Sequence, residues 1–416
     1  MHENHGGDRP DCQETHDKKE KIAAIMELSL YFEPVTAESL RLTDTDELKD
    51  RIFNSVVLFN PETTADIQEA EIAIVGVPES RNAYRNPTCE LGPDEIRRQF
   101  YQLHCWRKSV RILDLGNLII GKTVEDTYSA LAEILAYLIE NNVVPVILGG
   151  SNDLAFANYR AYEILEHVAN IVAIDSKFDL GDENTPIRSD AYVNKMVLQQ
   201  PNFLLNYANV GYQSYMNSPE SAAMMESLYF ETYRVGLMRG NLDEVEPIVR
   251  NADMVSLDIS AVRRPDAPGC PNNSSNGFYG EEICQISKFV GLSDKLTSFG
   301  IYEYDPTLDF NNQTSQLIAH ILWYFVEGYI FRQNDNKFKD KGEYRQFNIS
   351  VSGAPSELVF YNSKKTGRWW VLVPIHRKDS DLTQHYYLPC SYRDYQMACD
   401  DIISNRWWRT YHKINN

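Results

Sequence analysis

Short runs of hydrophobic residues alternate with longer helical patterns between about residue 70 and residue 330. Each short run is almost continuous in valine, isoleucine and leucine, which is typical of a parallel strand covered on both faces. The predicted strands are 71–77, 111–116, 143–150, 170–175, 254–260 and 298–303. The clearest helix is predicted over 123–141, where apolar residues recur at spacings of three and four.

This alternation predicts an α/β fold, a three-layer α-β-α sandwich on a mostly parallel sheet. The pattern changes after about residue 335, where a charged, turn-like stretch precedes three strand-like runs and a helical stretch over 392–405. We therefore predict three regions: a disordered tail over 1–25, a main domain over 26–335, and a small aromatic-rich C-terminal extension over 336–416 that packs on it.

Two Arg-Trp-Trp triplets, at 368–370 and 406–408, stand out in the extension. We expect them to form a small aromatic core, because large rings bury much apolar surface. A partner-binding surface is the alternative.

Charge and composition narrow the classes of function. The chain of 416 residues has a formal net charge of −19, which argues against a nucleic-acid binder or a polybasic membrane-surface protein. No apolar run approaches the ~20 residues needed to span a bilayer. The seven cysteines are scattered and lack a CxxC pair, which favours reduced thiols in a cytoplasmic protein.

Polar or acidic residues follow four of the predicted strands. They are Asn152 and Asp153, Asp175 to Asp179 with Lys177 between them, Asp258 and Ser260, and Glu303. Such residues are also common in turns and helix caps. In open α/β sheets, however, the ligand crevice lies outside the carboxyl ends of the strands. The repetition at four equivalent places therefore predicts one shared acidic site.

Taken in order, several stretches of this chain resemble the arginase/ureohydrolase family. They are Gly76-Val-Pro, Gly92-Pro-Asp-Glu-Ile-Arg97, Leu148-Gly149-Gly150, Ile174 to Asp179, Leu257 to Ser260 with Ala267-Pro-Gly269 behind it, and Glu303-Tyr-Asp-Pro306. The resemblance covers about residues 70–330. It implies a central sheet of about eight strands, assembly into homo-oligomers, and hydrolysis of guanidino, amidino or formimino C–N bonds with two bridged Mn²⁺ ions.

The resemblance also implies six metal ligands, from the motifs GGDH, DAHxD and DxD. This sequence departs at three of them: Asn152 and Lys177 stand where the family has histidine, and Ser260 where it has aspartate. The ligand positions Asp175, Asp179 and Asp258 are kept. Glu303 matches the glutamate with which the family grips a guanidinium group.

These replacements change the charge balance of the predicted site. Three aspartates and one lysine leave two net negative charges, and an ammonium group repels a neighbouring cation. We expect that the binuclear manganese centre is lost and that no cofactor is bound, with one weakly bound manganese ion as the alternative. Lys177 is expected to form an ion pair with the three aspartates rather than to act as a base, because they raise its pKa.

Two functions follow from these observations. In the first, the chain is a ureohydrolase-fold protein without hydrolytic activity, in a binding or regulatory role with an acidic pocket for a cationic guanidino or amino ligand. In the second, it is an active hydrolase of a guanidino or formimino compound, similar to arginase or formimidoylglutamase, that uses one or an atypical metal. In both we expect a homo-oligomer without a nucleic-acid or membrane partner.

Overall fold

The structure is a computed structural model. It describes residues 27–42, 50–61, 67–182, 184–335, 338, 341–355, 357–376 and 384–415. The tail predicted over 1–25 lies outside these residues. Among the described helices, none is long and apolar enough to cross a membrane.

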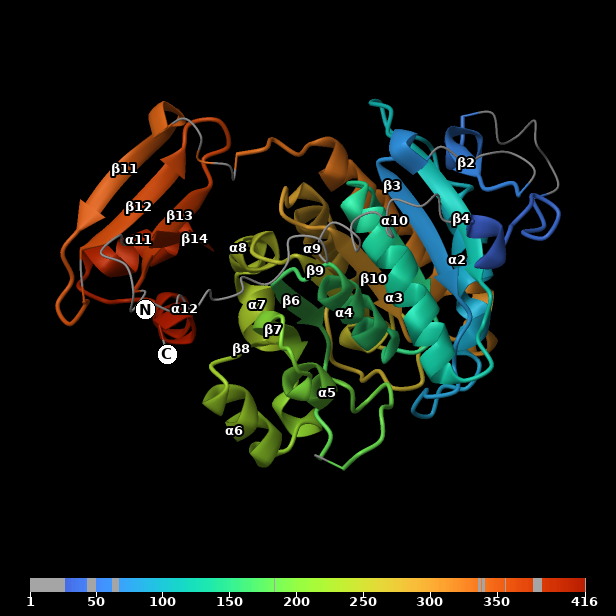
Figure 1. Cartoon of the computed structure of the whole chain (residues 1–416), viewed down its shortest axis with the longest axis horizontal. Helices are drawn as coiled ribbons and strands as arrows, with labels where there is room; N and C mark the ends of the chain where they lie inside the picture. Colours follow the sequence, from blue (N-terminus) through green and yellow to red (C-terminus); the bar gives the residue numbers. More distant parts are fainter. Residues whose placement is uncertain are drawn as a thin grey trace, which may run out of the picture.

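A ten-stranded sheet forms the centre of the molecule (Figure 1). Its strands lie in the order β1-β4-β3-β5-β10-β9-β6-β7-β8, and β2 also pairs with β4. Apart from β1, the strands pair in parallel. Their bounds are β1 Phe32–Glu33, β2 Val56–Leu58, β3 Ile72–Val77, β4 Ile112–Leu118, β5 Val144–Gly149, β6 Ala169–Ile174, β7 Leu204–Tyr212, β8 Glu231–Arg234, β9 Met254–Asp258 and β10 Ser298–Tyr302.

All six predicted strands are present, and the sheet is larger than the eight strands expected. Two of the additional strands, β1 and β2, are only two and three residues long, and β7 and β8 lack a continuous apolar run. In β7, Asn206 and Asn209 interrupt the hydrophobic residues, and β8 has the sequence ETYR. The mostly parallel α/β sheet is confirmed.

Helices cover both faces of this sheet and give it three layers. One face packs against α2 (Gly92–Phe100), α8 (Val245–Arg250), α9 (Gly280–Leu292) and α10 (Gln313–Ile330). The other packs against α3 (Val124–Glu140), α4 (Leu154–Ile164), α5 (Val193–Leu198) and α6 (Pro219–Ser227). The short α7 (Val235–Gly240) contributes Met238 to the first face. The helix predicted over 123–141 is α3, which Thr123 and Asp126 begin with a reciprocal capping box.

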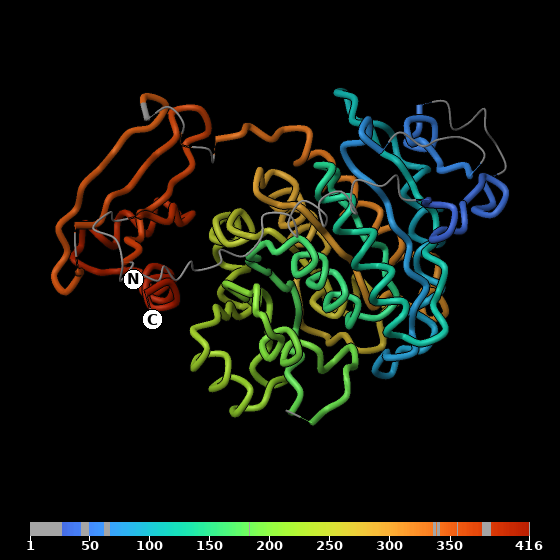
Figure 2. The backbone as a smooth tube through the Cα atoms, in the orientation of Figure 1, coloured from blue at the N-terminus to red at the C-terminus, as the bar shows by residue number. Residues whose placement is uncertain are grey.

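The C-terminal part folds as a four-stranded antiparallel sheet with two helices, drawn in orange and red beside the main domain in Figure 2. The strands are β11 (Tyr344–Ile349), β12 (Leu358–Ser363), β13 (Trp369–Ile375) and β14 (Gln384–Cys390). The prediction of one helix over 392–405 is wrong in its bounds. The stretch divides into α11 (Tyr392–Cys399) and α12 (Asn405–Asn415), separated by Asp401 at a φ of 62°.

Both Arg-Trp-Trp triplets contribute to this part of the chain. Trp407 is 1% exposed, and its indole N–H donates to the carbonyl of Leu372 at 2.8 Å. Trp370 is 2% exposed and lies under the guanidinium of Arg250, which belongs to the main domain.

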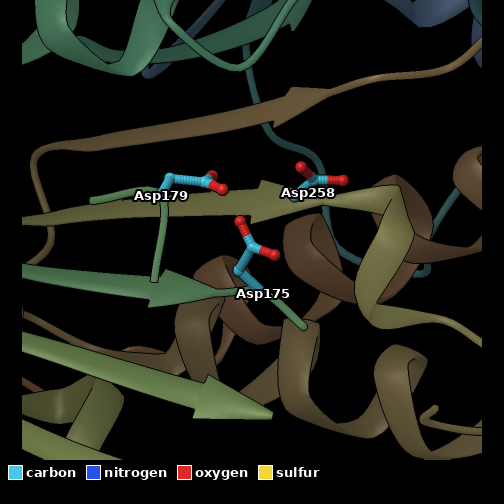
Figure 3. A group of neighbouring side chains, drawn as sticks. All are labelled: Asp175, Asp179 and Asp258. Atoms are coloured by element: carbon cyan, nitrogen blue, oxygen red, sulfur yellow. The ribbon is translucent and has the colours of Figure 1, made fainter. Parts of the chain in front are cut away.

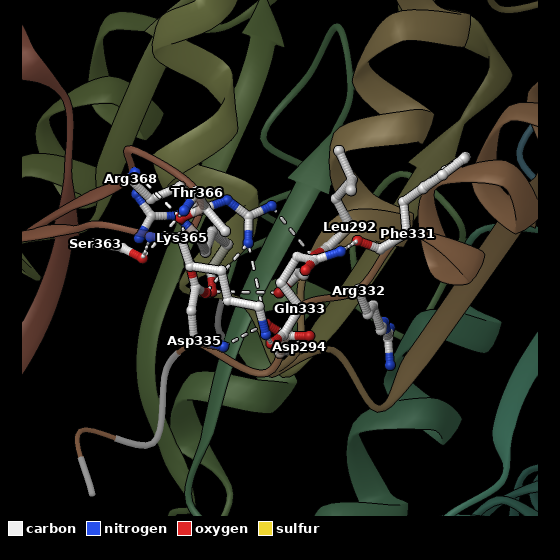
Figure 4. Close-up of polar contacts among 12 residues, drawn as sticks. Leu292, Asp294, Phe331, Arg332, Gln333, Asp335, Ser363, Lys365, Thr366 and Arg368 are labelled. Atoms are coloured by element: carbon white, nitrogen blue, oxygen red, sulfur yellow. Dashed lines mark hydrogen bonds and ion pairs between the residues drawn. The ribbon is translucent and has the colours of Figure 1, made fainter. Parts of the chain in front are cut away.

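Arg368 links the C-terminal part to the main domain through three carboxylates, of which Asp294 and Asp335 are labelled in Figure 4. Its guanidinium lies 3.1 Å from Glu246 and 3.5 Å from Asp335, and Asp294 is 4.0 Å away. Arg250 adds hydrogen bonds to the carbonyls of Trp369 and Cys390. The extension therefore contacts α8 and the segment after α9 through the buried Arg250 and the partly buried Arg368.

Candidate functional site

Four adjacent strands bring the predicted site residues to one edge of the sheet. In the order β5, β10, β9, β6, their carboxyl ends carry Asn152, Glu303, Asp258 and Asp175, of which Asp258 is the last residue of β9 and the others follow their strands. Glycine makes this convergence possible at the end of β5. A Cβ on Gly150 would lie 2.0 Å from the carbonyl oxygen of Glu79, so only glycine lets the two loops approach this closely.

Asp175, Asp179 and Asp258 form a buried carboxylate triad. One oxygen of each lies within 4.8 Å of the others, and Figure 3 shows the three side chains turned toward one another. All three are 7% exposed or less. Carboxylate oxygens at this spacing suit a hard divalent cation such as Mn²⁺.

Burial and mutual repulsion disfavour the charged forms of the triad. Burial, followed by the charge of Asp179, holds the pKa of Asp175 well above its usual range. Burial and the charge of Asp175 do the same to the pKa of Asp258. Burial raises the pKa of Asp179 to about 7. Three crowded carboxylates with raised pKa values are stabilised either by a proton or by a bound cation.

Two of the replaced ligand positions are occupied by hydrogen-bond donors to the triad. The side-chain amide of Asn152 donates to Asp179 at 3.0 Å and to Asp175 at 3.3 Å. The hydroxyl of Ser260 donates to Asp175 at 3.3 Å. Its backbone N–H donates to Asp258 at 2.6 Å. Donors to the charged form partly offset the cost of burying it.

Glu303 lies beside the triad and is 1% exposed. Its carboxylate accepts hydrogen bonds from the backbone N–H of Asn152 at 3.0 Å and from the side chain of Asn86 at 2.9 Å. Asn272 makes a longer contact of 3.4 Å. Burial raises the pKa of Glu303. Asn152 thus joins the triad to Glu303, through its side chain on one side and its backbone on the other.

Asp153 does not join this network. One of its carboxylate oxygens accepts a hydrogen bond from the hydroxyl of Tyr128 on α3. The other has no partner among the described residues. Asp153 therefore anchors its loop to a neighbouring helix.

The ion pair expected of Lys177 is also not formed. Its backbone N–H donates to Asp175 at 2.8 Å. No described carboxylate lies within 4.0 Å of its Nζ, which is instead 5.7 Å from the centre of the Tyr84 ring. Burial opposes the charge of Lys177, but Asp179, Asp175 and Asp258 outweigh it and raise its pKa. The ammonium therefore acts on the triad only from a distance.

Three residues of the network were missed in the sequence. They are Asn86, Asn272 and Ser256, whose hydroxyl donates to the side chain of Asn152 at 3.2 Å. Ser256 could have been found, because residues two apart on a strand share a face and Asp258 is already assigned. Asn86 and Asn272 lie in irregular loops, where the sequence gives no comparable signal.

Comparison with known proteins shows which family this chain resembles. The model of the arginase family matches residues 70–327. Formimidoylglutamase of Bacillus subtilis is 22% identical over 281 residues, which are 62% of this chain and 86% of that protein. Formimidoylglutamase of Staphylococcus haemolyticus is 24% identical, over 68% of this chain and 95% of that protein.

Solved structures agree in fold. The crystal structure of the Bacillus subtilis formimidoylglutamase covers 68% of this chain and 92% of its own, with a TM-score of 0.61 at 20% identity. Formiminoglutamase of Trypanosoma cruzi, solved with Mn²⁺₂, covers 65% of this chain and 97% of its own, with a TM-score of 0.60 at 16% identity.

The expectation that no cofactor is bound is wrong. A family member of the same fold was solved with manganese, and the described residues of this chain include a buried triad of possible metal ligands. The triad fits one divalent cation. It does not provide the ligands of a second, because Asn152 and Ser260 direct hydrogen-bond donors at it and Lys177 is cationic. Because the family model matches residues 70–327, which is more than half of the sequence, this chain belongs to the arginase family.

Proposed function

We propose that this protein binds one divalent cation at Asp175, Asp179 and Asp258 and hydrolyses a C–N bond of a formimino or guanidino compound. The observation that carries the proposal is the buried triad beside the buried Glu303. A bound divalent ion lowers the pKa of a water ligand, so that hydroxide is available near neutral pH. Hydrolysis would release formamide from a formimino group or urea from a guanidino group.

Glu303 is the residue we assign to the cationic end of the substrate. A carboxylate accepts two parallel hydrogen bonds from a planar amidinium or guanidinium group. The donors from Asn86 and Asn152 fix the orientation of Glu303 before any substrate arrives. Such preorganisation lets the carboxylate act without rearranging.

A second function, ligand binding without turnover, is favoured by a different observation. Asn152 and Ser260 already donate hydrogen bonds to Asp175. These contacts stabilise the triad in the absence of the full set of family ligands. In this case the acidic site would hold a cation or a cationic guanidino ligand in a binding or regulatory role. We propose a homo-oligomer in either case, as the family resemblance implies.

Metal analysis combined with product assays separates the two functions. Protein purified with Mn²⁺ would be assayed for bound metal, and for formamide and urea released from N-formimino and guanidino amino acids. We expect about one equivalent of metal, with turnover that Asp258→Asn abolishes. Metal binding without either product would select the second function. Absence of metal binding at millimolar Mn²⁺ would overturn the proposed hydrolase and would leave, of the second function, only the binding of a cationic guanidino ligand.

A further inference from the structure

A cavity of about 370 Å³ lies at the edge of the central sheet opposite to the carboxylate site. It is lined by Ser55 and Val57 at β2, by Glu69 and Ala70 before β3, and by most of the segment 105–113, which leads into β4. These three strands run in parallel, and the cavity is at their amino ends, whereas the triad is at the carboxyl ends of the sheet. A molecule in this amino-edge cavity therefore cannot touch the triad.

Apolar atoms make up most of the surface of the amino-edge cavity. Val110, Ile112 and Leu113 are buried, and Trp106 is partly buried. Val57 is 63% exposed. Contact of apolar surface with water is unfavourable, and a bound apolar group removes it. A cavity of this size with mainly apolar and aromatic walls is typical of small-molecule sites.

Two hydrogen bonds fix the wall of the cavity that contains Trp106. The indole N–H of Trp106 donates to the carbonyl of Trp323 on α10 at 3.1 Å. In return, the indole N–H of Trp323 donates to the carbonyl of His104 at 2.9 Å. The two rings stack with 5.9 Å between their centres. Because this wall is held in place by α10, a ligand does not have to order it on binding.

The charged residues of the lining are two cations and one acid. Arg111 lies 3.9 Å from Glu71, in an exposed contact that contributes little. Lys108 donates a hydrogen bond to a backbone carbonyl at the end of α10 at 3.2 Å, and no described carboxylate lies within 4.0 Å of its ammonium. With Glu69 as the acid, the lining carries one net positive charge in a chain of −19. The charge of the cavity is thus opposite to that of the protein as a whole.

We infer that the amino-edge cavity is a second binding site, which takes a small organic anion with an apolar body. The apolar body lies against Val57, Trp106 and Val110, and the anionic group lies at Lys108. This inference goes beyond the proposed hydrolysis and does not depend on it, because the two sites are at opposite edges of the sheet.

Protection of Cys105 from alkylation tests the inference. Cys105 lines the cavity and is exposed, and Cys399 on α11 is the other exposed cysteine among the described residues. The probe is 8-anilinonaphthalene-1-sulfonate, and iodoacetamide labelling of each thiol is followed by peptide mass spectrometry. At ten times the dissociation constant, we expect the probe to slow the alkylation of Cys105 about tenfold. The rate at Cys399 should not change.

Two variants at exposed positions test the two ends of the ligand. Val57→Glu places a carboxylate in the lining and should weaken binding of the probe by about tenfold or more. Val168→Glu, at a valine that is 57% exposed and outside the lining, is its matched control and should bind as wild type. Lys108→Gln should weaken binding about twofold to fivefold, as for an exposed ion pair. It should leave the binding of N-phenyl-1-naphthylamine, which has the same rings without the sulfonate, unchanged.

The inference is overturned if the probe at millimolar concentration does not protect Cys105, or if it slows alkylation equally at Cys399. Equal protection by the two dyes, together with no effect of Lys108→Gln, would overturn the assignment of an anion. Sedimentation of wild type and Val57→Glu tests a different occupant. An oligomer that Val57→Glu dissociates, with no protection of Cys105 by the probe, would assign the cavity to a second copy of the chain instead.

Discussion

The side-chain amide of Asn152 donates a hydrogen bond to the carboxylate of Asp179, with 3.0 Å between Nδ2 and Oδ2. The same nitrogen lies 3.3 Å from Asp175, so one neutral side chain bridges two acids. Its oxygen accepts from Ser256. Asn152 is 1% exposed, so this bridge lies inside the protein. Asn152 therefore stands at a ligand position of the family as a hydrogen-bond donor to two of the three aspartates.

Removing one carboxylate of the triad should prevent cation binding. Asp258→Asn is expected to weaken Mn²⁺ binding by more than about tenfold, since even residues that only support a ligand contribute that much. Elemental analysis after equilibrium dialysis measures it. Asp266→Asn, which breaks a pair with Arg263 away from the site, is the matched control. Equal metal content in both variants would contradict the assignment of ligands.

Cation binding should weaken as the pH falls. The pKa of Asp179 is raised to about 7, so below pH 7 the cation must displace a proton. We expect the affinity for Mn²⁺ to fall by about tenfold per pH unit between pH 7 and pH 6 for one displaced proton. Isothermal titration in buffers of different ionisation enthalpy measures both the affinity and the protons released. A constant affinity from pH 6 to pH 8 would argue against Asp179 as a ligand.

The raised pKa of Asp179 also makes the stability of the metal-free protein depend on pH. A carboxyl group whose pKa is higher in the folded state retains its proton better there than in the unfolded chain. The contribution of Asp179 to stability is therefore lost as the pH rises from about 4 to about 7. Urea unfolding at pH 5 and pH 7.5 should show that Asp179→Asn removes part of this pH dependence. If the variant keeps the full dependence, another group causes it.

Restoring the three family ligands should restore a second metal ion. The combined variant Asn152→His, Lys177→His and Ser260→Asp is expected to bind two equivalents of Mn²⁺, because it replaces two donors and one cation by ligands. Metal content compared with wild type measures the effect. A variant that folds and still holds only one ion would show that the surrounding loops are remodelled as well.

Mutation of Glu303 should reduce hydrolysis without reducing the binding of metal by the triad. Glu303→Gln removes the charge that we assign to amidine binding but leaves the three aspartates in place. We expect metal content close to that of wild type and a loss of hydrolysis of about a hundredfold or more, on the scale of a lost electrostatic contact to the reacting group. Loss of metal together with activity would instead place Glu303 among the ligands.

The docking of the C-terminal part should depend on Arg250. This side chain is 4% exposed and pairs with Glu246 at 2.9 Å. Arg250→Met should lower the free energy of unfolding by roughly 3–5 kcal/mol, because it removes the ion pair with Glu246 and the hydrogen bonds to the carbonyls of Trp369 and Cys390. Urea denaturation followed by tryptophan fluorescence measures the change. The exposed Arg345→Met should stay within about 0.5 kcal/mol of wild type.

The sequence by itself determined the fold class, the six central strands and the acidic site. Continuous apolar runs require burial on both faces, which a parallel sheet under helices provides. The carboxyl ends of parallel strands meet at one edge, which is why the strand pattern alone places Asp175, Asp258 and Glu303 together. The polar β7 and the end of α11 at Cys399 were not predicted, since neither carries a strong local pattern.

Only the tertiary structure decided what the individual side chains do. Asn152 and Ser260 stand at replaced ligand positions and act as donors to the triad. Asp153 bonds Tyr128 on another element, and Lys177 extends to Tyr84 rather than to its sequence neighbours. Asn86, 217 residues from Glu303 in the chain, holds its carboxylate. Periodicity constrains which face a residue occupies, whereas a side chain's partner depends on loops that come together only when the whole sheet has formed.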